Sequence, residues 1–139
     1  MPIGAGIVPC GVRRMTEPSF DPEMLARLRD LKEVDIETRS AGGDVHPATI
    51  WVVVDASNRV LVRSWRGAGA RWYREAVAAG EGSLIVDGAT LPVRIERATD
   101  PERIAACSER LLAKYGGGST ARSMVRDEVL DTTLEIRPG

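Results

Sequence analysis

The residues best suited to bind an anion lie in one segment, Arg59 to Arg74, which contains five arginines and no acidic residue. The whole chain of 139 residues has a formal net charge of −1, so this segment is a local excess of positive charge. Gly67 and Gly69 join a predicted strand to a predicted helix. An arginine can bind two phosphate oxygens at once, and the first N–H groups of a helix lack intrahelical partners. The segment therefore predicts a site for an anion such as a phosphate.

Strand geometry restricts which of these side chains can share a ligand. In a regular strand, Ser64 and Arg66 point to one face, whereas Arg63 and Trp65 point to the other. Both pairs can reach one ligand only if the strand is bulged or ends within this stretch. The alternative interpretation of the arginines is a solvated rim that carries scattered surface charge.

The chain has one histidine, His46, which precedes a predicted strand together with Pro47. It is either a loop residue at the strand entrance or a polar contact and proton donor for a ligand ring. No Gly-x-Ser-x-Gly turn of a serine nucleophile is present, and the Walker and dinucleotide loops are missing. One histidine and two separated cysteines, Cys10 and Cys107, do not supply a zinc site. We therefore predict no metal and expect a bound cofactor to perform any difficult chemistry.

Composition restricts the class of protein further. The length fits one domain, and 43% hydrophobic with 28% charged residues is ordinary for a globular chain. The near-neutral net charge argues against a nucleic-acid binder. No apolar run reaches the roughly 18–20 residues of a membrane span. The cysteines do not indicate a disulfide framework, so we expect a cytoplasmic protein.

Local sequence signals indicate where the domain begins and where its helices lie. Residues 1–20 show no periodicity, and we expect them to form a flexible tail before a single domain at 21–139. Asp21 with Pro22, and Asp100 with Pro101, predict the starts of two helices. A short helix is expected over residues 71–79, where Gly80 is placed to stop it, and a further helical turn or two within residues 120–130.

Six segments have the composition or alternation of strands, namely residues 34–39, 49–54, 60–65, 83–86, 91–95 and 132–136. The run 49–54 is expected to be a central strand covered on both faces. A sheet of this size exposes its edges unless it closes on itself. We therefore predict a mainly β protein, a six-stranded antiparallel barrel with flanking helices.

The stretch from His46 to Ser64 resembles the central hairpin of the FMN-binding split-barrel superfamily, which includes the pyridoxamine phosphate oxidases. Arg66 to Ala76 is similar to the glycine-rich turn and Trp-Tyr helix of its deazaflavin-dependent nitroreductase branch. Arg122 to Pro138 is similar to the closing strand of a small uncharacterised family within that superfamily. The resemblance covers residues 33–138 and implies a split β-barrel. It also implies a homodimer with a flavin in a groove near the subunit interface.

Carried over by position, the resemblance implies two sets of cofactor-binding residues. Those expected to hold the phosphate end are Arg63, Ser64, Arg66, Arg71 and Trp72. Those expected to line the ring are Pro47, Thr49 and Trp51. Without the resemblance, Trp51 is interpreted either as a core residue or as a wall for a flat ligand. The chain departs from the branch at Glu75 and Ala76, where the branch has Asn-Leu, and it lacks the phosphate-site lysine of the oxidases.

The resulting functional expectation is an oxidoreductase that uses a deazaflavin (coenzyme F-420) or FMN to transfer hydride to or from a small organic substrate. His46 is the candidate catalytic residue. The alternative is a cofactor-free split barrel that binds a small ligand or catalyses a non-redox step on a natural product. Glu75 beside the arginines and the single His46 favour that alternative. A purely structural dimer module is the third interpretation.

Overall fold

The computed structural model describes residues 20–116 and 118–139. The predicted flexible tail lies outside the described residues except for its last member, Phe20. Phe20 is buried in the apolar core, and the first helix begins two residues later, at Pro22.

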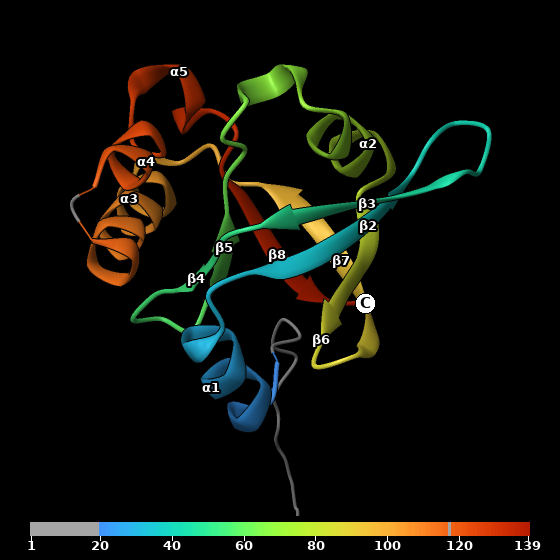
Figure 1. Cartoon of the computed structure of the whole chain (residues 1–139), viewed down its shortest axis with the longest axis horizontal. Coiled ribbons are helices and arrows are strands. Elements are labelled where there is room, and N and C mark those ends of the chain that lie inside the picture. Colours follow the sequence, from blue (N-terminus) through green and yellow to red (C-terminus); the bar gives the residue numbers. More distant parts are fainter. Residues whose placement is uncertain (1–19, 117) are drawn as a thin grey trace, which may run out of the picture.

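Seven strands form one antiparallel sheet in the order β3-β2-β6-β7-β8-β5-β4. They are β2 (Val34–Arg39), β3 (Val45–Ile50), β4 (Val52–Val54), β5 (Val60–Val62), β6 (Glu81–Val86), β7 (Ala89–Arg97) and β8 (Leu134–Pro138). The first and last strands of this order are β3 and β4, which only Trp51 separates in the chain. The sheet therefore curls until its two edges meet at Trp51, and it forms a barrel that is split there (Figure 1).

The strand count differs from the predicted six because the run 49–54 is not one strand. Ile50 pairs with β2, whereas Val52 pairs with β5. The chain thus changes partners across Trp51, and the expected central strand supplies both edges of the sheet instead. Its second half is buried as expected, but Thr49 is exposed and Trp51 is only half-buried.

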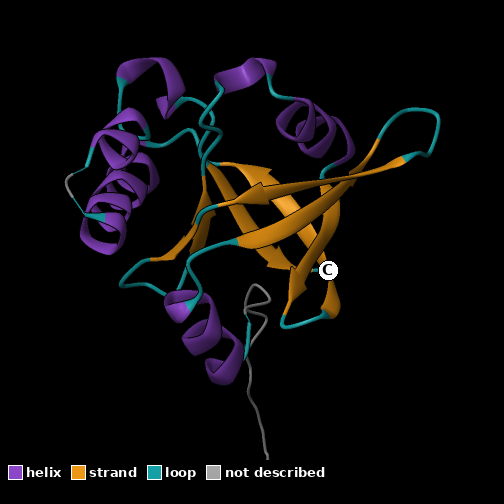
Figure 2. Cartoon of the chain, in the orientation of Figure 1, coloured by secondary structure: helices purple, strands orange, loops and turns teal. Residues whose placement is uncertain are grey.

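Helices flank the barrel and cover its ends (Figure 2). They are α1 (Pro22–Asp30), the 3-10 turn η1 (Gly67–Gly69), α2 (Arg71–Ala79), α3 (Pro101–Tyr115), α4 (Ser119–Ser123) and α5 (Asp127–Leu130). The predicted caps are confirmed. Asp21 and Asp100 accept N–H bonds from the first turns of α1 and α3, and Gly80 ends α2 in the left-handed conformation.

Two strand boundaries differ from the expectation, and both affect the candidate site. β3 begins before His46 and Pro47, which lie opposite Thr38 and Glu37 of β2, so neither is a loop residue at a strand entrance. β5 ends at Val62 rather than at residue 65. Strand alternation therefore does not govern residues 63–66, and their side chains are free to follow the turn instead.

The apolar core has two parts, one inside the barrel and one between the β4–β5 pair and α3. Cys107 lies in the second part and is fully buried. Burial raises the pKa of its thiol to about 11, so this cysteine is a packing residue. Among the described residues, no helix is long and apolar enough to cross a membrane.

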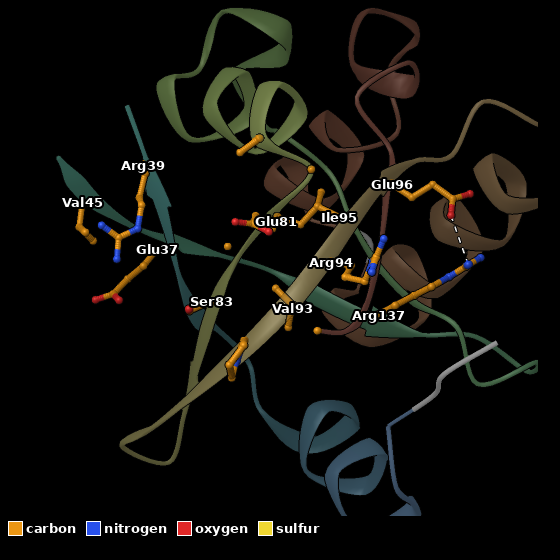
Figure 3. Close-up of a pocket in the computed structure, with 15 residues that line it drawn as sticks. Glu37, Arg39, Val45, Glu81, Ser83, Val93, Arg94, Ile95, Glu96 and Arg137 are labelled. Carbon is orange, nitrogen blue, oxygen red and sulfur yellow. Dashed lines mark ion pairs between the residues drawn. The ribbon is translucent and has the colours of Figure 1, made fainter. Parts of the chain in front are cut away.

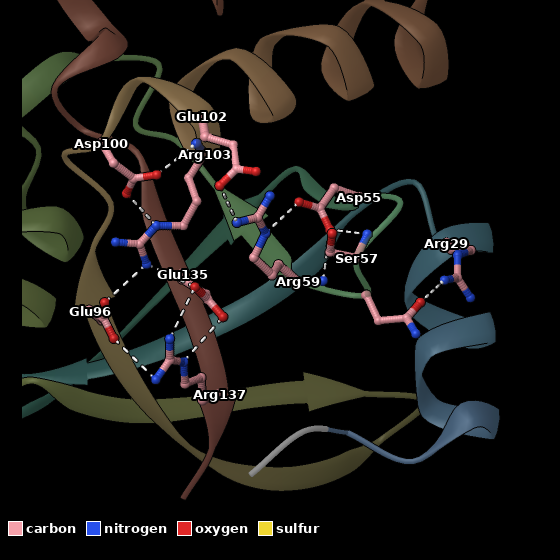
Figure 4. A network of polar contacts seen from close by, with 11 residues as sticks. Arg29, Asp55, Ser57, Arg59, Glu96, Asp100, Glu102, Arg103, Glu135 and Arg137 are labelled. Atoms are coloured by element: carbon pink, nitrogen blue, oxygen red, sulfur yellow. Dashed lines mark hydrogen bonds and ion pairs between the residues drawn. The ribbon is translucent and has the colours of Figure 1, made fainter. Parts of the chain in front are cut away.

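Three arginines and five carboxylates form a network where β7 and β8 meet the start of α3 and the β4–β5 turn (Figure 4). We call it the flank network; its members are Arg59, Arg103, Arg137, Asp55, Glu96, Asp100, Glu102 and Glu135. Arg103 contacts Glu135 at 2.8 Å and Glu96 at 3.0 Å. Each of the three guanidinium groups in this network faces at least one carboxylate.

Candidate functional site

A groove of about 450 Å³ opens beside the split in the barrel. Its walls come from the end of β3, the turn after β5, the start of α2, and α4 with the residue that follows it. The lining residues are Glu33, Thr49, Ile50, Trp51, Arg63, Trp65, Arg66, Ala70, Trp72, Thr120 and Met124. A volume of this size lies within the range of small-molecule and cofactor sites in proteins.

The groove brings together five of the residues predicted to bind a cofactor: Thr49, Trp51, Arg63, Arg66 and Trp72. It does not include the other three, nor the candidate catalytic residue His46. Pro47 lies further along β3, the side chain of Ser64 is buried in the turn, Arg71 is exposed at the start of α2, and His46 contacts a different part of that helix. The split at Trp51 explains the grouping, because it places the end of β3 next to the turn that follows β5.

Arg63 is the most buried residue of the groove wall, with 1% of its surface exposed. Its guanidinium donates to the hydroxyls of Thr133 (2.9 Å) and Ser108 (2.8 Å) and to the carbonyls of Met124 (2.9 Å) and Ile104 (3.0 Å). These four bonds use four of the five N–H donors of an arginine. The fifth has no acceptor among the described residues.

All the partners of Arg63 are neutral, and no carboxylate of the described chain lies within ion-pair distance of it. Burial lowers the pKa of its guanidinium, and the nearby Cys107 offsets this only in part. An arginine nevertheless stays protonated in proteins. The groove wall thus contains a buried positive charge without a counter-charge, which is costly unless an anion approaches it.

The turn between Arg63 and α2 is fixed by its backbone. The hydroxyl of Ser64 donates to the carbonyl of Gly67 at 2.7 Å, and Gly67 adopts a positive φ of 76°. Arg126 donates to the carbonyl of Trp65 at 2.8 Å. Arg66 is exposed at the groove and forms no ion pair with the described residues. The hydroxyl of Ser64, which was predicted to contact a phosphate, thus makes a bond that shapes the turn in this structure.

All three tryptophans of the chain line the groove. Trp65 is 53% exposed, while Trp51 and Trp72 are half-buried. Trp51 stacks on Tyr115, with ring centroids 3.8 Å apart and an angle of 7° between the planes. Trp72 meets Tyr73 edge to face. Flat aromatic walls of this kind suit a planar ligand.

His46 and Glu75 form a separate polar cluster that joins β3 and β2 to α2. Glu75 lies 3.0 Å from Nδ1 of His46 and accepts a 2.8 Å hydrogen bond from Thr38. Burial alone would raise the pKa of Glu75. The hydrogen bonds from Thr38 and His46, with the electrostatic contributions of His46 and Arg71, lower it overall. Glu75 does not line the groove, and its carboxylate contacts Thr38 and His46 of the sheet; of the predicted phosphate-site arginines, only Arg71 affects its pKa.

A second and larger hollow lies on the outer face of β2, β6 and β7 (Figure 3). Charged side chains of both signs line it, including Glu37, Arg39, Glu81 and Arg94. None of the predicted site residues belongs to it. Its mixed charges make it a weaker candidate for a flat anionic ligand than the groove.

The sequence interpretation missed several groove residues. Thr120 and Met124 come from the segment after α3, and nothing in the sequence placed that segment beside the β5 turn. Tyr115, which contacts Trp51 from outside the groove, was not singled out in the sequence either. The enrichment of tryptophan among the aromatic residues was visible and could have indicated Trp65 as a wall residue. No group of three or more potential metal ligands occurs in the described part of the chain.

Residues 24–136 match the family described as "Uncharacterized protein conserved in bacteria (DUF2255)". No curated protein matches the chain by sequence.

Several solved structures share the fold. HutZ, the heme storage protein from Vibrio cholerae, has a TM-score of 0.61 and 14% identity, over 87% of this chain and 91% of that one. An F420 reductase has a TM-score of 0.54 and 17% identity, over 82% and 91%. An FMN-binding protein from Syntrophomonas wolfei has a TM-score of 0.53 and 15% identity, over 85% of each chain. These similarities confirm the predicted split-barrel fold.

Proposed function

The chain belongs to the family described as DUF2255, uncharacterised proteins conserved in bacteria. We propose that it is an oxidoreductase and that its groove binds a flavin or deazaflavin. The observation that carries the proposal is the charge of Arg63, which is buried in the groove wall without a carboxylate partner. Proteins that share the fold include one named as an F420 reductase and one named as FMN-binding. Those names support the choice of ligand class.

The residues present fit a phosphate-bearing cofactor at one end of the groove. Arg63 and Arg66 are its two cations, and Arg63 retains one N–H donor that no described residue accepts. Glu33 also lines the groove and is exposed, so it is free to face water. A bound phosphate would supply the counter-charge that Arg63 lacks, which is the arrangement that buried cations require.

The residues also fit a flat ring. Trp51 and Trp72 are half-buried walls, and Trp65 is exposed at the groove. When bound, a flavin or deazaflavin supplies hydride-transfer chemistry. The protein's own contribution would be to neutralise the phosphate, hold the ring against indole faces and limit the access of water.

His46 is not assigned a catalytic role in this proposal. Its ring nitrogen lies against Glu75, and it does not line the groove. The small organic substrate and the homodimer remain predictions from the resemblance. A second subunit would be needed to place His46 near a ligand if it takes part in the reaction.

The test is a titration of the purified protein with FMN and with coenzyme F-420, followed by tryptophan fluorescence. Because all three tryptophans line the groove, a ligand there is expected to quench most of the emission. The absorbance spectrum of the freshly purified protein gives an independent readout of any flavin that it carries. Absence of binding to either cofactor at tens of micromolar would contradict the proposal and favour the cofactor-free alternative.

A further inference from the structure

The last turn of α3 reaches the split in the barrel at Trp51. Tyr115, the final residue of that helix, stacks on Trp51 almost in parallel at 3.8 Å. Trp51 lines the groove, and Tyr115 does not. One face of the indole is therefore covered by the protein, and the surface that it presents to the groove is set by this stack.

The hydroxyl of Tyr115 is anchored as firmly as its ring. It donates to the carbonyl of Lys32 at 2.6 Å and also contacts the carbonyl and the N–H of Val52, at 3.2 and 3.3 Å. Val52 is the first residue of β4, directly after Trp51. The phenol thus fixes the backbone at the point where the chain leaves one edge of the sheet and joins the other.

Lys114 binds the same stretch of backbone, at Val52. Its ammonium donates to the carbonyls of Val52 (2.7 Å) and Leu28 (3.0 Å) and lies 5.3 Å from the centre of the Tyr115 ring. Burial lowers the pKa of Lys114 to about 8, with Asp30 opposing the shift. The ammonium thus makes a cation–π contact with the same phenol ring that stacks on Trp51.

We propose that Tyr115 is a positioning residue that acts through Trp51, and that the Trp51–Tyr115 stack provides two prebuilt layers onto which the planar ring of the groove ligand adds a third. The inference rests on the proposed function, because it concerns the ligand of the same groove. It adds a residue outside the groove that determines how well a ring is held, and it separates ring binding from phosphate binding.

The physical reason is preorganisation. An indole that is already fixed loses little side-chain entropy when a ring stacks on it. An offset aromatic pair contributes about 0.5–1.5 kcal/mol beyond burial, which corresponds to roughly 2- to 10-fold in affinity. The absence of Tyr115 would leave Trp51 free to rotate at the split, and the ligand would then have to order it.

The experiment is a double-mutant cycle on ligand affinity with two probes, FMN and 1-pyrenesulfonate, a planar aromatic anion unrelated to flavins. Tyr115→Leu removes the stack, Tyr115→Phe keeps it, and Trp51→Leu removes the wall. We expect Tyr115→Leu to weaken both probes by roughly 3- to 10-fold and Tyr115→Phe to restore most of that loss. In the Trp51→Leu background, Tyr115→Leu should add less than about 2-fold.

Near-ultraviolet circular dichroism of the same variants reports the stack without any ligand, and far-ultraviolet spectra report whether each variant folds. Additive effects of Tyr115→Leu and Trp51→Leu would overturn the inference. It would also be overturned if the wild type bound neither FMN nor 1-pyrenesulfonate. Coupled effects on pyrenesulfonate without any binding of FMN or coenzyme F-420 would uphold Tyr115 as a positioning residue and reject the flavin proposal. Binding of FMN with no effect of Tyr115→Leu would uphold the flavin proposal and reject Tyr115 as a positioning residue.

Discussion

The molecule contains two arginine-rich regions, and only in one of them are the positive charges paired with carboxylates. In the flank network, Arg59, Arg103 and Arg137 each face one or more carboxylates (Figure 4). In the groove, Arg63 is more deeply buried than any of them, yet it has only neutral partners. A sequence with nearly equal numbers of acidic and basic residues could have paired both regions.

The difference indicates what each region is for. Charges that are matched within the chain contribute to stability and leave nothing for a ligand to complete. A buried charge that lacks a counter-ion lowers stability by itself, and it persists where an external anion supplies the missing charge. The comparison predicts that substitutions in the flank network change stability, and that substitutions at the groove change ligand affinity.

The largest effect is expected from Arg103→Met in the flank network. Among the described residues, the substitution leaves Glu135, whose side chain is 8% exposed, and Glu96 with Arg137 as their only cationic partner, and it leaves Asp100 without one. The free energy of unfolding should fall by about 3 kcal/mol, the scale of breaking a buried ion pair. Urea denaturation measures the change, with Arg66→Met as the matched control. An equal loss in both variants would remove the distinction between the two regions.

Arg66→Ala should have the converse effect. Arg66 is exposed and has no ion-pair partner in the described chain, so stability should change by less than about 0.5 kcal/mol. The affinity for the proposed cofactor should weaken by about 1–3 kcal/mol, the scale of a lost charged hydrogen bond. Isothermal titration calorimetry measures this, with the exposed Arg94→Ala on β7 as control. An unchanged affinity would exclude Arg66 from the phosphate site.

The turn itself can be tested at its two glycines. Gly67 has a φ of 76°, whereas Gly69 has an ordinary φ and open space where a Cβ would lie. Gly67→Ala should reduce the free energy of unfolding by about 1–2 kcal/mol because an L residue is strained there. Gly69→Ala should be close to neutral. If the two variants are equally stable, the turn does not depend on the left-handed residue.

The smallest effect concerns the pH dependence of the Glu75 cluster. Thr38 and His46 lower the folded-state pKa of Glu75 below its unfolded value. Its stabilising contribution is therefore present above the unfolded pKa and is lost as pH falls through the folded pKa. The difference in Tm between the wild type and Glu75→Gln should be largest near neutral pH and shrink toward pH 3. Thr38→Val should weaken the same dependence, and a difference that is constant with pH would contradict the assignment.

Local signals in the sequence predicted most of the elements. The caps at Asp21 and Asp100, the stop at Gly80 and the alternation of residues 34–39 are short-range features, and the structure contains each of them. The break at Trp51 could not be predicted in this way. It arises because the curled sheet has to close, and the β-branched run on either side of Trp51 gives no local sign of a change of partner.

The candidate site was predictable only in part. The arginines, glycines and tryptophans of residues 63–72 are contiguous, so their grouping was visible. The acceptors of Arg63 lie 41 to 70 residues away in the chain, and their contact depends on how α3 and the residues before β8 pack. The same packing brings Tyr115 to Trp51. The position of Glu75 also depends on tertiary contacts, since its partners Thr38 and His46 are on β2 and β3.

The central claim is that the uncompensated arginines of the groove hold the anionic end of a planar cofactor. Its most direct test compares the affinities of FMN and riboflavin, which differ only in the phosphate, for the wild type and for Arg66→Ala. The account predicts that the wild type binds FMN at least about 10-fold more tightly than riboflavin, as expected for a charge-assisted contact of roughly 1.4 kcal/mol or more. This preference should shrink in Arg66→Ala. Equal affinity of the wild type for the two flavins would contradict the claim.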